Sequence, residues 1–293
     1  MHKSLVMLFL LAAAGLAPAA EPSARLATFD EVQADLGKAG LRLLDVRPRA
    51  DYDRGHLPGA VWVDAKAAQA LAAKPGALTD RNAWEAWIAP LGIEARGEVL
   101  VLDGERQRDA ARIWWLLGYL GVEKVGLVDG NVPLWVGQGR PIVSETSRVE
   151  PSAFPVSFRA SKHATRDDVL RAVEGKTAAI VDARTLAEYT GQQKNSKRGG
   201  HVPTACRLEW SDLVDADGRF LPEAALKAKL ASLGVAPGKP VITHCQTGGR
   251  ASVDAFAFER IGIPTKNFYL GWSDWGNAEE TPVVEGAEAG SKP

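Results

Sequence analysis

Residues 241–252 read Val241-Ile242-Thr243-His244-Cys245-Gln246-Thr247-Gly248-Gly249-Arg250-Ala251-Ser252, and this stretch decides the fold of the second half of the chain. Its apolar, β-branched start predicts a buried strand over 240–243, and a helix is expected over 251–260, directly after a short loop. Strand, loop and helix in this order are typical of an α/β fold whose parallel strands end at one edge of the sheet. Cys245 therefore lies where such folds place their reactive groups.

The loop after this strand is suited to hold a sulfur anion. Successive backbone N–H groups can point into such a loop and form a nest backed by the positive end of the following helix. The N–H groups expected to do so belong to Gln246, Thr247, Gly248, Gly249 and Arg250. Two adjacent glycines allow the backbone angles of such a curl, and the arginine adds positive charge. We therefore predict that Cys245 is an ionised nucleophile at neutral pH.

Two other interpretations of Cys245 compete with this one. A lone Cys is most often a small buried hydrophobe, but a core position does not require two glycines and an arginine before a helix. Cys-dependent phosphatases also place a cysteine loop between a strand and a helix, with five residues between the Cys and the Arg. Here four residues separate Cys245 from Arg250, a loop that suits one sulfur atom.

The same sequence pattern occurs twice in the chain, in the same order. The landmarks are Asp-x-Arg, which begins at Asp45 and Asp182, and His-x-Pro, which begins at His56 and His201. The offset between the copies rises from 137 residues at the first landmark to 145 at the second. The second copy therefore contains an insertion of eight residues, which we expect at 191–198. Further along, Asp103 takes the position that Cys245 takes in the second copy.

The repeat predicts two domains, which agrees with a length of 293 residues, more than one hydrophobic core usually organises. The expected division is a signal peptide over 1–20, an N-terminal domain over 24–140, a linker over 141–157, a C-terminal domain over 158–283 and a tail over 284–293. Each domain is expected to be a parallel sheet flanked by helices.

The first twenty residues have the pattern of a secretory signal peptide. Lys3 is followed by an apolar run from Leu5 to Leu16 and by the small-residue site Ala17-Pro18-Ala19. A membrane-spanning helix needs about 20 apolar residues, so this run is too short to anchor the protein. We predict export to the periplasm or the exterior, with no membrane attachment after cleavage.

Charge and cysteine content narrow the function further. Lys and Arg total 35 against 36 Asp and Glu, so no global basic field recruits nucleic acid. With only Cys206 and Cys245, the chain has no disulfide scaffold. Cys206 is expected in the core, and a disulfide that traps Cys245 is left open, since it depends on the distance between them.

These motifs resemble those of tandem-domain rhodaneses, and the resemblance covers about residues 27–275. The matching features are the two Asp-x-Arg segments, the two His-x-Pro segments, the cysteine loop and the closing Gly and Trp residues at 130–135 and 271–275. The resemblance implies two rhodanese-like domains. It also implies that the N-terminal domain is catalytically silent, because the carboxylate of Asp103 cannot accept a sulfane sulfur.

The resemblance further implies a thiosulfate sulfurtransferase. In such an enzyme Cys245 takes the outer sulfur of thiosulfate as a persulfide and passes it to cyanide, a thiol or the Cys of a protein acceptor. No metal or other cofactor is required. Two alternatives stay open: a 3-mercaptopyruvate sulfurtransferase, and a persulfide carrier that turns over small donors poorly.

The choice of donor depends on the arginines around the loop. Arg250, Arg184 and Arg198 are candidates for donor binding, although Arg184 could equally pair with Asp182, and Arg198 could be a solvated loop charge. Mercaptopyruvate users grip the donor carboxylate with two arginines, and here Glu188 takes the place of the first. A carboxylate would be repelled by Glu188, so the sequence favours thiosulfate.

The histidine side chains of the motifs are expected to be structural. His56 and His201 occupy matching places in copies of which one lacks the cysteine, so a hydrogen bond in a turn is expected for both. His244 is expected to be structural, because the nest and Arg250 ionise Cys245 without a base. Trp272 either forms a wall of the site or packs in the core.

Overall fold

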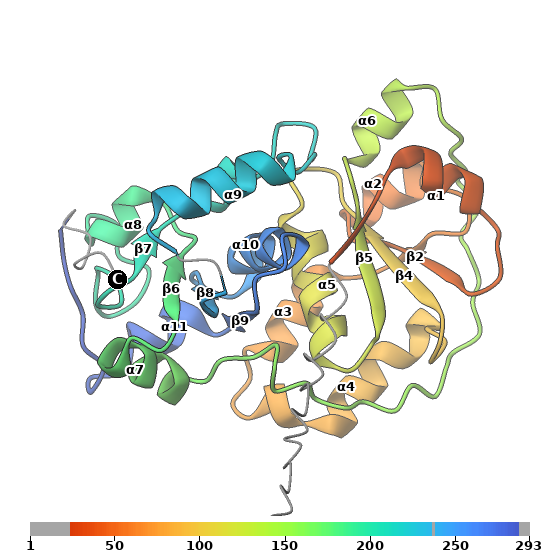
Figure 1. Ribbon diagram of the computed structural model, residues 1–293. Coiled ribbons are helices and arrows are strands. Elements are labelled where there is room, and N and C mark those ends of the chain that lie inside the picture. Colours follow the sequence, from red (N-terminus) through yellow and green to blue (C-terminus); the bar gives the residue numbers. More distant parts are fainter. Residues whose placement is uncertain (1–23, 236–237, 287–293) are drawn as a thin grey trace, which may run out of the picture.

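The computed structural model describes residues 24–235 and 238–286, and the expected signal peptide at 1–20 lies outside the described residues. The chain forms two parallel sheets, each flanked by helices (Figure 1). The α/β class and the two-domain organisation expected from the repeat are confirmed. None of the described helices is long and apolar enough to cross a membrane.

The N-terminal domain is built on a five-stranded sheet in the order β1-β5-β4-β2-β3. Its strands are β1 (Arg25–Ala27), β2 (Leu41–Asp45), β3 (Val61–Trp62), β4 (Glu98–Leu102) and β5 (Lys124–Val128). Its helices are α1 (Phe29–Asp35), α2 (Arg49–Arg54), α3 (Ala65–Ala72), α4 (Arg81–Ile88), α5 (Arg108–Tyr119) and α6 (Val132–Gly137), with 3-10 turns η1 (Ala77–Thr79) and η2 (Ala89–Leu91).

The C-terminal domain repeats this plan with a four-stranded sheet in the order β7-β6-β8-β9. Its strands are β6 (Ala179–Asp182), β7 (Cys206–Arg207), β8 (Val241–His244) and β9 (Thr265–Phe268). Its helices are α7 (Arg166–Gly175), α8 (Leu186–Thr190), α9 (Glu223–Ser232), α10 (Gly249–Arg260) and α11 (Gly271–Trp275), with the 3-10 turn η3 (Trp210–Asp212).

Both faces of each sheet are covered, because successive residues of a strand point to opposite faces. In β4, Leu100 and Leu102 pack with α1, α2 and α6, whereas Val99 and Val101 pack with α3, α4 and α5. In the second sheet, Ile180 and Ile242 pack with α7, α8 and α11, and the opposite face packs with α9 and α10.

The two domains share one hydrophobic core at their interface. Helices α5 and α10 pack against each other between the two sheets (Figure 1). Trp114 of α5 meets Phe256 of α10 edge to face, with ring centroids 5.0 Å apart. Helix α5 begins directly after the loop that holds Asp103, and α10 begins directly after the loop that holds Cys245. The domain interface therefore brings together the helices that follow these two loops.

Element boundaries differ slightly from the sequence prediction. The helix expected over 251–260 begins two residues earlier, and the expected strand over 240–243 is shifted by one residue. Helix α7 begins with a capping box formed by Thr165 and Asp168.

The expected linker at 141–157 and tail at 284–293 are partly built into the domains. Val143 exchanges backbone hydrogen bonds with His56, and Val284 does the same with His201. Further along the linker, Phe154 and Val156 are buried in the shared core. The repeat therefore extends a few residues beyond its Trp landmarks in both copies, which the composition of these segments does not indicate.

Candidate functional site

Cys245 lies at the carboxyl end of β8, at the start of the loop that leads into α10. Its side chain is buried, with 1% of the residue exposed. Gly248 closes the loop in a left-handed conformation with φ of +83°, and a Cβ there would overlap the ring of Tyr269. The glycine expected for a tight curl is therefore required both by the backbone angle and by the neighbouring ring.

The loop is curled because three successive carbonyl groups are held outward. The N–H groups of Trp272 and Ser273, in the first turn of α11, donate to Cys245 O at 2.7 Å and Gln246 O at 3.1 Å. Arg112 donates through Nη1 to Thr247 O at 2.7 Å. In a trans peptide the C=O and the next N–H point in opposite directions, so the N–H groups of Gln246, Thr247 and Gly248 are turned inward.

This arrangement agrees with the predicted nest at Gln246, Thr247 and Gly248 but not at Gly249. The N–H of Gly249 donates to Thr247 O at 3.1 Å and is therefore turned out of the nest. For the N–H of Arg250, no backbone acceptor is found among the described residues. An anion at the centre of the loop is thus within a ring of inward N–H groups at the positive end of α10.

The close approach of α11 to the loop depends on Gly271. Its φ is +53°, and a Cβ at this position would overlap the carbonyl group of Cys245. Any side chain here would push α11 away from the loop and break the hydrogen bonds to Cys245 O and Gln246 O. The closing Gly-Trp landmark of the sequence repeat therefore has a direct role in shaping the cysteine loop.

Arg250 does not present a free charge to the site. Its Nη1 and Nη2 donate to the two carboxylate oxygens of Glu188 at 2.6 and 2.9 Å. Burial alone would raise the pKa of Glu188, but the hydrogen bonds and charge of Arg250 outweigh it and lower that pKa to about 2. The two side chains form a neutral, partly buried pair at the edge of the loop, a partnership that the sequence did not indicate.

Arg184 and Arg198, the other two candidates for donor binding, are structural. Arg184 is buried, donates to both oxygens of Asp182 and to Gly200 O, and lies over the ring of Trp272 at 4.3 Å. Arg198 donates to the carbonyl groups at 275, 278 and 281. The ion pair with Asp182 was the alternative for Arg184, and Arg198 is held by oxygens of the fold instead of being the solvated charge considered as its alternative.

The histidines of the repeat occupy equivalent turns, as expected. Nδ1 of His56 lies 2.8 Å from Tyr52 O, and Nδ1 of His201 lies 2.9 Å from Tyr189 O. Each ring also stacks on that tyrosine. Trp272 is buried in the core and donates to Arg198 O, so packing is its main role.

Two buried ionisable groups next to the loop are neutral. Burial lowers the pKa of His244 to about 4, so its ring is uncharged at neutral pH. Asp254, on α10, is fully buried, and neither carboxyl oxygen has a hydrogen-bond partner among the described residues. Burial and the charge of Cys245 raise the pKa of Asp254 well above its usual value, so this carboxyl group is protonated.

The insertion predicted at 191–198 is a loop that covers one side of the site. Its base closes where Gly199 approaches Gly191, and its tip contacts the cysteine loop. Gln246 donates through Nε2 to Asn195 O at 3.0 Å and to Ser196 Oγ at 3.1 Å. The extra residues of the second copy therefore help to fix the loop that holds the reactive cysteine.

The N-terminal domain covers the opposite side of the cysteine loop through residues that sequence reasoning missed. Besides Arg112, Gln69 of α3 donates through Nε2 to Thr247 Oγ1 at 3.2 Å. Neither residue belongs to a repeat motif, and both act across the domain interface. A charged residue inside the apolar run of α5 was the one available signal for Arg112.

The position of Cys206 excludes a disulfide with Cys245. Cys206 opens β7, and β6 lies between β7 and β8. Two strand spacings amount to about 10 Å, which is more than the roughly 7 Å that a disulfide spans between Cα atoms. Burial raises the pKa of Cys206 to about 11, so its thiol is protonated and unreactive.

The matching loop of the N-terminal domain shows what such a loop binds. The carboxyl group of Asp103 folds into its own loop and accepts hydrogen bonds from the N–H groups of Glu105 at 2.9 Å and Ala110 at 3.5 Å. An acidic group thus occupies the centre of this loop. Burial raises the pKa of Asp103 to about 6 in spite of these hydrogen bonds.

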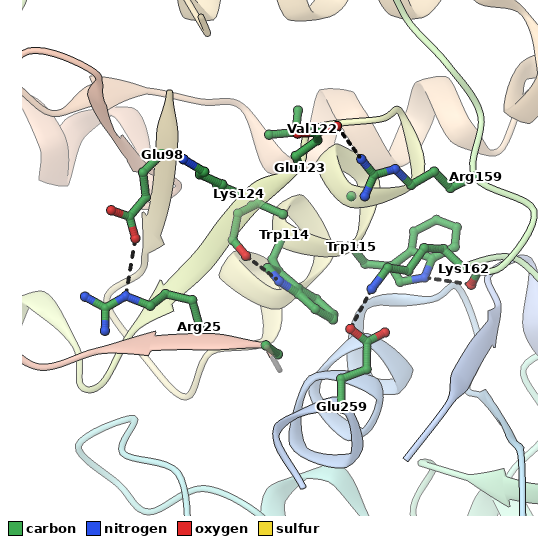
Figure 2. Close-up of a pocket in the computed structure, with 13 residues that line it drawn as sticks. Arg25, Glu98, Trp114, Trp115, Val122, Glu123, Lys124, Arg159, Lys162 and Glu259 are labelled. Carbon is green, nitrogen blue, oxygen red and sulfur yellow. Dashed lines mark hydrogen bonds and ion pairs between the residues drawn. The ribbon is translucent and has the colours of Figure 1, made fainter. Parts of the chain in front are cut away.

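A pocket of about 670 Å³, whose lining residues Figure 2 shows, does not include Cys245 among them. Its wall includes Glu98 and Lys124, which open β4 and β5, so it lies at the amino ends of these strands. The reactive groups of parallel sheets lie at the carboxyl ends. We therefore assign the chemistry to the Cys245 loop, which lies at the carboxyl end of β8.

Asp103→Asn should stabilise the protein at alkaline pH. The folded-state pKa of about 6 lies above the unfolded value of 3.8, so the carboxyl group lowers the stability of the fold progressively as the pH rises from about 4 to about 6, and the full loss is present above pH 6. The free energy of unfolding should rise by about 2–3 kcal/mol at pH 8 and change little at pH 4, as chemical denaturation would measure. The exposed Asp53→Asn serves as control, and an equal change at both pH values for Asp103→Asn would contradict the interpretation.

Comparison with known proteins agrees with this geometry. The family model for the rhodanese-like domain matches residues 28–138 and again 165–278. The thiosulfate sulfurtransferase of Azotobacter vinelandii is 31% identical over 86% of this chain and 94% of its own length. The 3-mercaptopyruvate sulfurtransferase of Escherichia coli K12 is 31% identical over 80% of this chain and 84% of its own length.

A solved structure shares the arrangement of both domains. The crystal structure of SseA from Escherichia coli matches with a TM-score of 0.76 and 25% identity, over 85% of this chain and 99% of that one. The two family matches, the relatives and the fold together show that the chain belongs to the rhodanese-like domain family, as a tandem-domain sulfurtransferase of the rhodanese type.

Proposed function

We propose that this protein transfers a sulfane sulfur from thiosulfate to cyanide or a thiol through a persulfide on Cys245. The observation that carries the proposal is the ring of inward N–H groups around Cys245, held by Arg112 and the start of α11. The same loop in the N-terminal domain holds the carboxyl group of Asp103. A loop that surrounds an acidic group in one copy is suited to hold a thiolate or a persulfide in the other.

The reaction is a two-step displacement. The Cys245 thiolate attacks the outer sulfur of thiosulfate, a new S–S bond forms, and sulfite leaves with the electron pair of the bond that breaks. The acceptor then attacks the outer sulfur of the persulfide, which regenerates the thiolate. Because residues 1–20 predict export, we propose that the acceptor is met outside the cytoplasm.

Thiosulfate is favoured over mercaptopyruvate because the three arginines considered for donor binding are all engaged by other groups of the described fold. Arg184 and Arg198 donate to oxygens of the fold, and Arg250 is paired with Glu188. Thiosulfate presents its outer sulfur directly to the nucleophile and relies on the N–H ring for stabilisation of the product persulfide. Mercaptopyruvate would need a partner for its carboxylate as well.

Sulfur loading should depend on Cys245 alone. After treatment with thiosulfate, intact mass spectrometry should show one added sulfur on the wild-type protein and on Cys206→Ser, and none on Cys245→Ser. Cys206 is the matched control, since it is a protonated thiol in the same domain. Loading of Cys245→Ser would refute the mechanism, and a stable persulfide that small acceptors do not discharge would favour a sulfur carrier.

The donor preference is tested by steady-state kinetics with cyanide as the acceptor. We expect kcat/KM for thiosulfate to exceed that for mercaptopyruvate by about tenfold or more, because the ratio measures the difference in transition-state stabilisation. A ratio in favour of mercaptopyruvate would assign the enzyme to the other donor class.

The neutral pair of Arg250 and Glu188 predicts a recovery in the double variant. Arg250→Gln leaves the buried carboxylate of Glu188 without its partner, which costs about 3–5 kcal/mol in such pairs, and it repels an anionic donor. Arg250→Gln with Glu188→Gln removes both charges and should restore most of the thiosulfate activity and stability. If the double variant is as impaired as the single one, Arg250 contacts the donor directly.

A further inference from the structure

Arg112 reaches from the N-terminal domain into the cysteine loop. It lies on α5, is 4% exposed, and donates through Nη1 to Thr247 O at 2.7 Å and to the hydroxyl oxygen of Tyr269 at 3.0 Å. A Cβ on Gly249 would overlap its guanidinium group, so the absence of a side chain there allows this approach. The guanidinium group is thus packed against the first residue of α10.

The charge of Arg112 is only weakly compensated by protein carboxylates. Asp109 Oδ1 lies 3.9 Å from Nε, outside hydrogen-bonding distance, and this carboxylate is about one-third exposed and also contacts Arg108. Nε itself has no hydrogen-bond partner among the described residues. A buried cation in this situation is costly unless an anion lies within reach.

The other ionisable groups that face Cys245 carry no net charge. Arg250 is paired with Glu188, and Arg184 with Asp182. Burial holds three further groups neutral: it raises the pKa of Asp254 and of Tyr269 and lowers that of His244 to about 4. After this pairing, Arg112 is the cation that donates a hydrogen bond into the cysteine loop without a carboxylate in hydrogen-bonding distance, among the residues that the structure describes.

The surroundings of Arg112 indicate where its counter-charge lies. The guanidinium group lies at the positive end of a twelve-residue helix, α10, which would repel it if the loop held no anion. Burial by itself lowers the pKa of Arg112, but Tyr269 and the charge of Cys245 raise it above its usual value. The position of the guanidinium group at this end of α10 is the observation that points to an anionic sulfur in the loop.

We propose that Arg112 is a positioning residue for sulfur transfer. Its hydrogen bond turns the Thr247 peptide so that the Gly248 N–H faces the sulfur. Its unmatched positive charge keeps Cys245 anionic. This inference rests on the proposed sulfurtransferase mechanism. It assigns a specific contribution to the domain that lacks the cysteine: that domain provides the cation, and the other provides the nucleophile.

Two substitutions separate the charge of Arg112 from its hydrogen bond. Arg112→Gln keeps a donor for Thr247 O but removes the charge, whereas Arg112→Lys keeps the charge. Each is made in a Cys206→Ser background, so that iodoacetamide reports on Cys245 alone. The rate of alkylation is followed across a pH series, together with kcat/KM for thiosulfate.

Arg112→Gln should raise the pH midpoint of Cys245 alkylation by about one unit or more and lower the rate at neutral pH about tenfold, because a nearby cation favours the thiolate. kcat/KM for thiosulfate should fall in parallel. Arg112→Lys should keep the midpoint close to that of the wild type. An unchanged midpoint in Arg112→Gln, or an equal rise in both variants, would overturn the inference.

Arg106→Gln is the matched control. Arg106 also crosses the interface from the N-terminal domain, but it donates to Ser211 O and Val214 O at 2.8 Å and not to a carbonyl group of the cysteine loop. Its guanidinium group lies over the ring of Trp210, which packs against Cys245, so it tests a second cation close to the site. If this variant shifts the midpoint as Arg112→Gln does, the effect comes from domain docking and the inference fails. Alkylation by iodoacetamide needs no sulfur donor, so the pH midpoint can be measured even if the protein does not use thiosulfate. Failure of the proposed function and failure of this inference therefore give different results.

Discussion

Three outward-facing carbonyl groups hold the backbone from Cys245 to Gly248 in its curl, and the rest of the site depends on them. Two are fixed by N–H groups at the start of α11 and the third by Arg112 of α5. These partners come from elements far apart in the sequence and, for Arg112, from the other domain. A short loop with two glycines is flexible by itself, so its conformation is a property of both domains packed together.

The electrostatics of the site follow a second rule, that buried charges are matched in pairs. Such pairs are formed by Arg184 with Asp182 and by Arg250 with Glu188. Two further buried groups, Asp254 and His244, avoid the cost of burying a charge by being neutral. This matching explains why Arg250, which lies close to Cys245 in the sequence, has no uncompensated charge. It is also the reason why we propose thiosulfate and not a donor that needs a partner for its carboxylate.

Local patterns of the chain predicted the strand, loop and helix around Cys245, the repeat, the eight-residue insertion and the matching position of Asp103 in the first copy. Each of these depends on residues close together in sequence. The roles first considered for Arg184, Arg198 and Arg250 depend on which oxygens surround each guanidinium group, and that is decided by tertiary contacts. Arg112 was missed for the same reason, since its partners at Thr247 and Tyr269 are more than 130 residues away in the chain.

The two loops of the protein provide an internal comparison for the role of Arg112. Counted from the first residue of each helix, Arg112 of α5 corresponds to Val253 of α10, so α10 offers no cation at the position from which α5 reaches the partner loop. The strongest influences on Asp103 are burial, the loop N–H groups and the carboxylate of Asp109, and its pKa is raised to about 6. N–H groups alone therefore do not offset the burial of an anion in such a loop. A negatively charged sulfur in the second loop would face the same cost of burial, and this is the physical reason for the role that we propose for Arg112 across the interface.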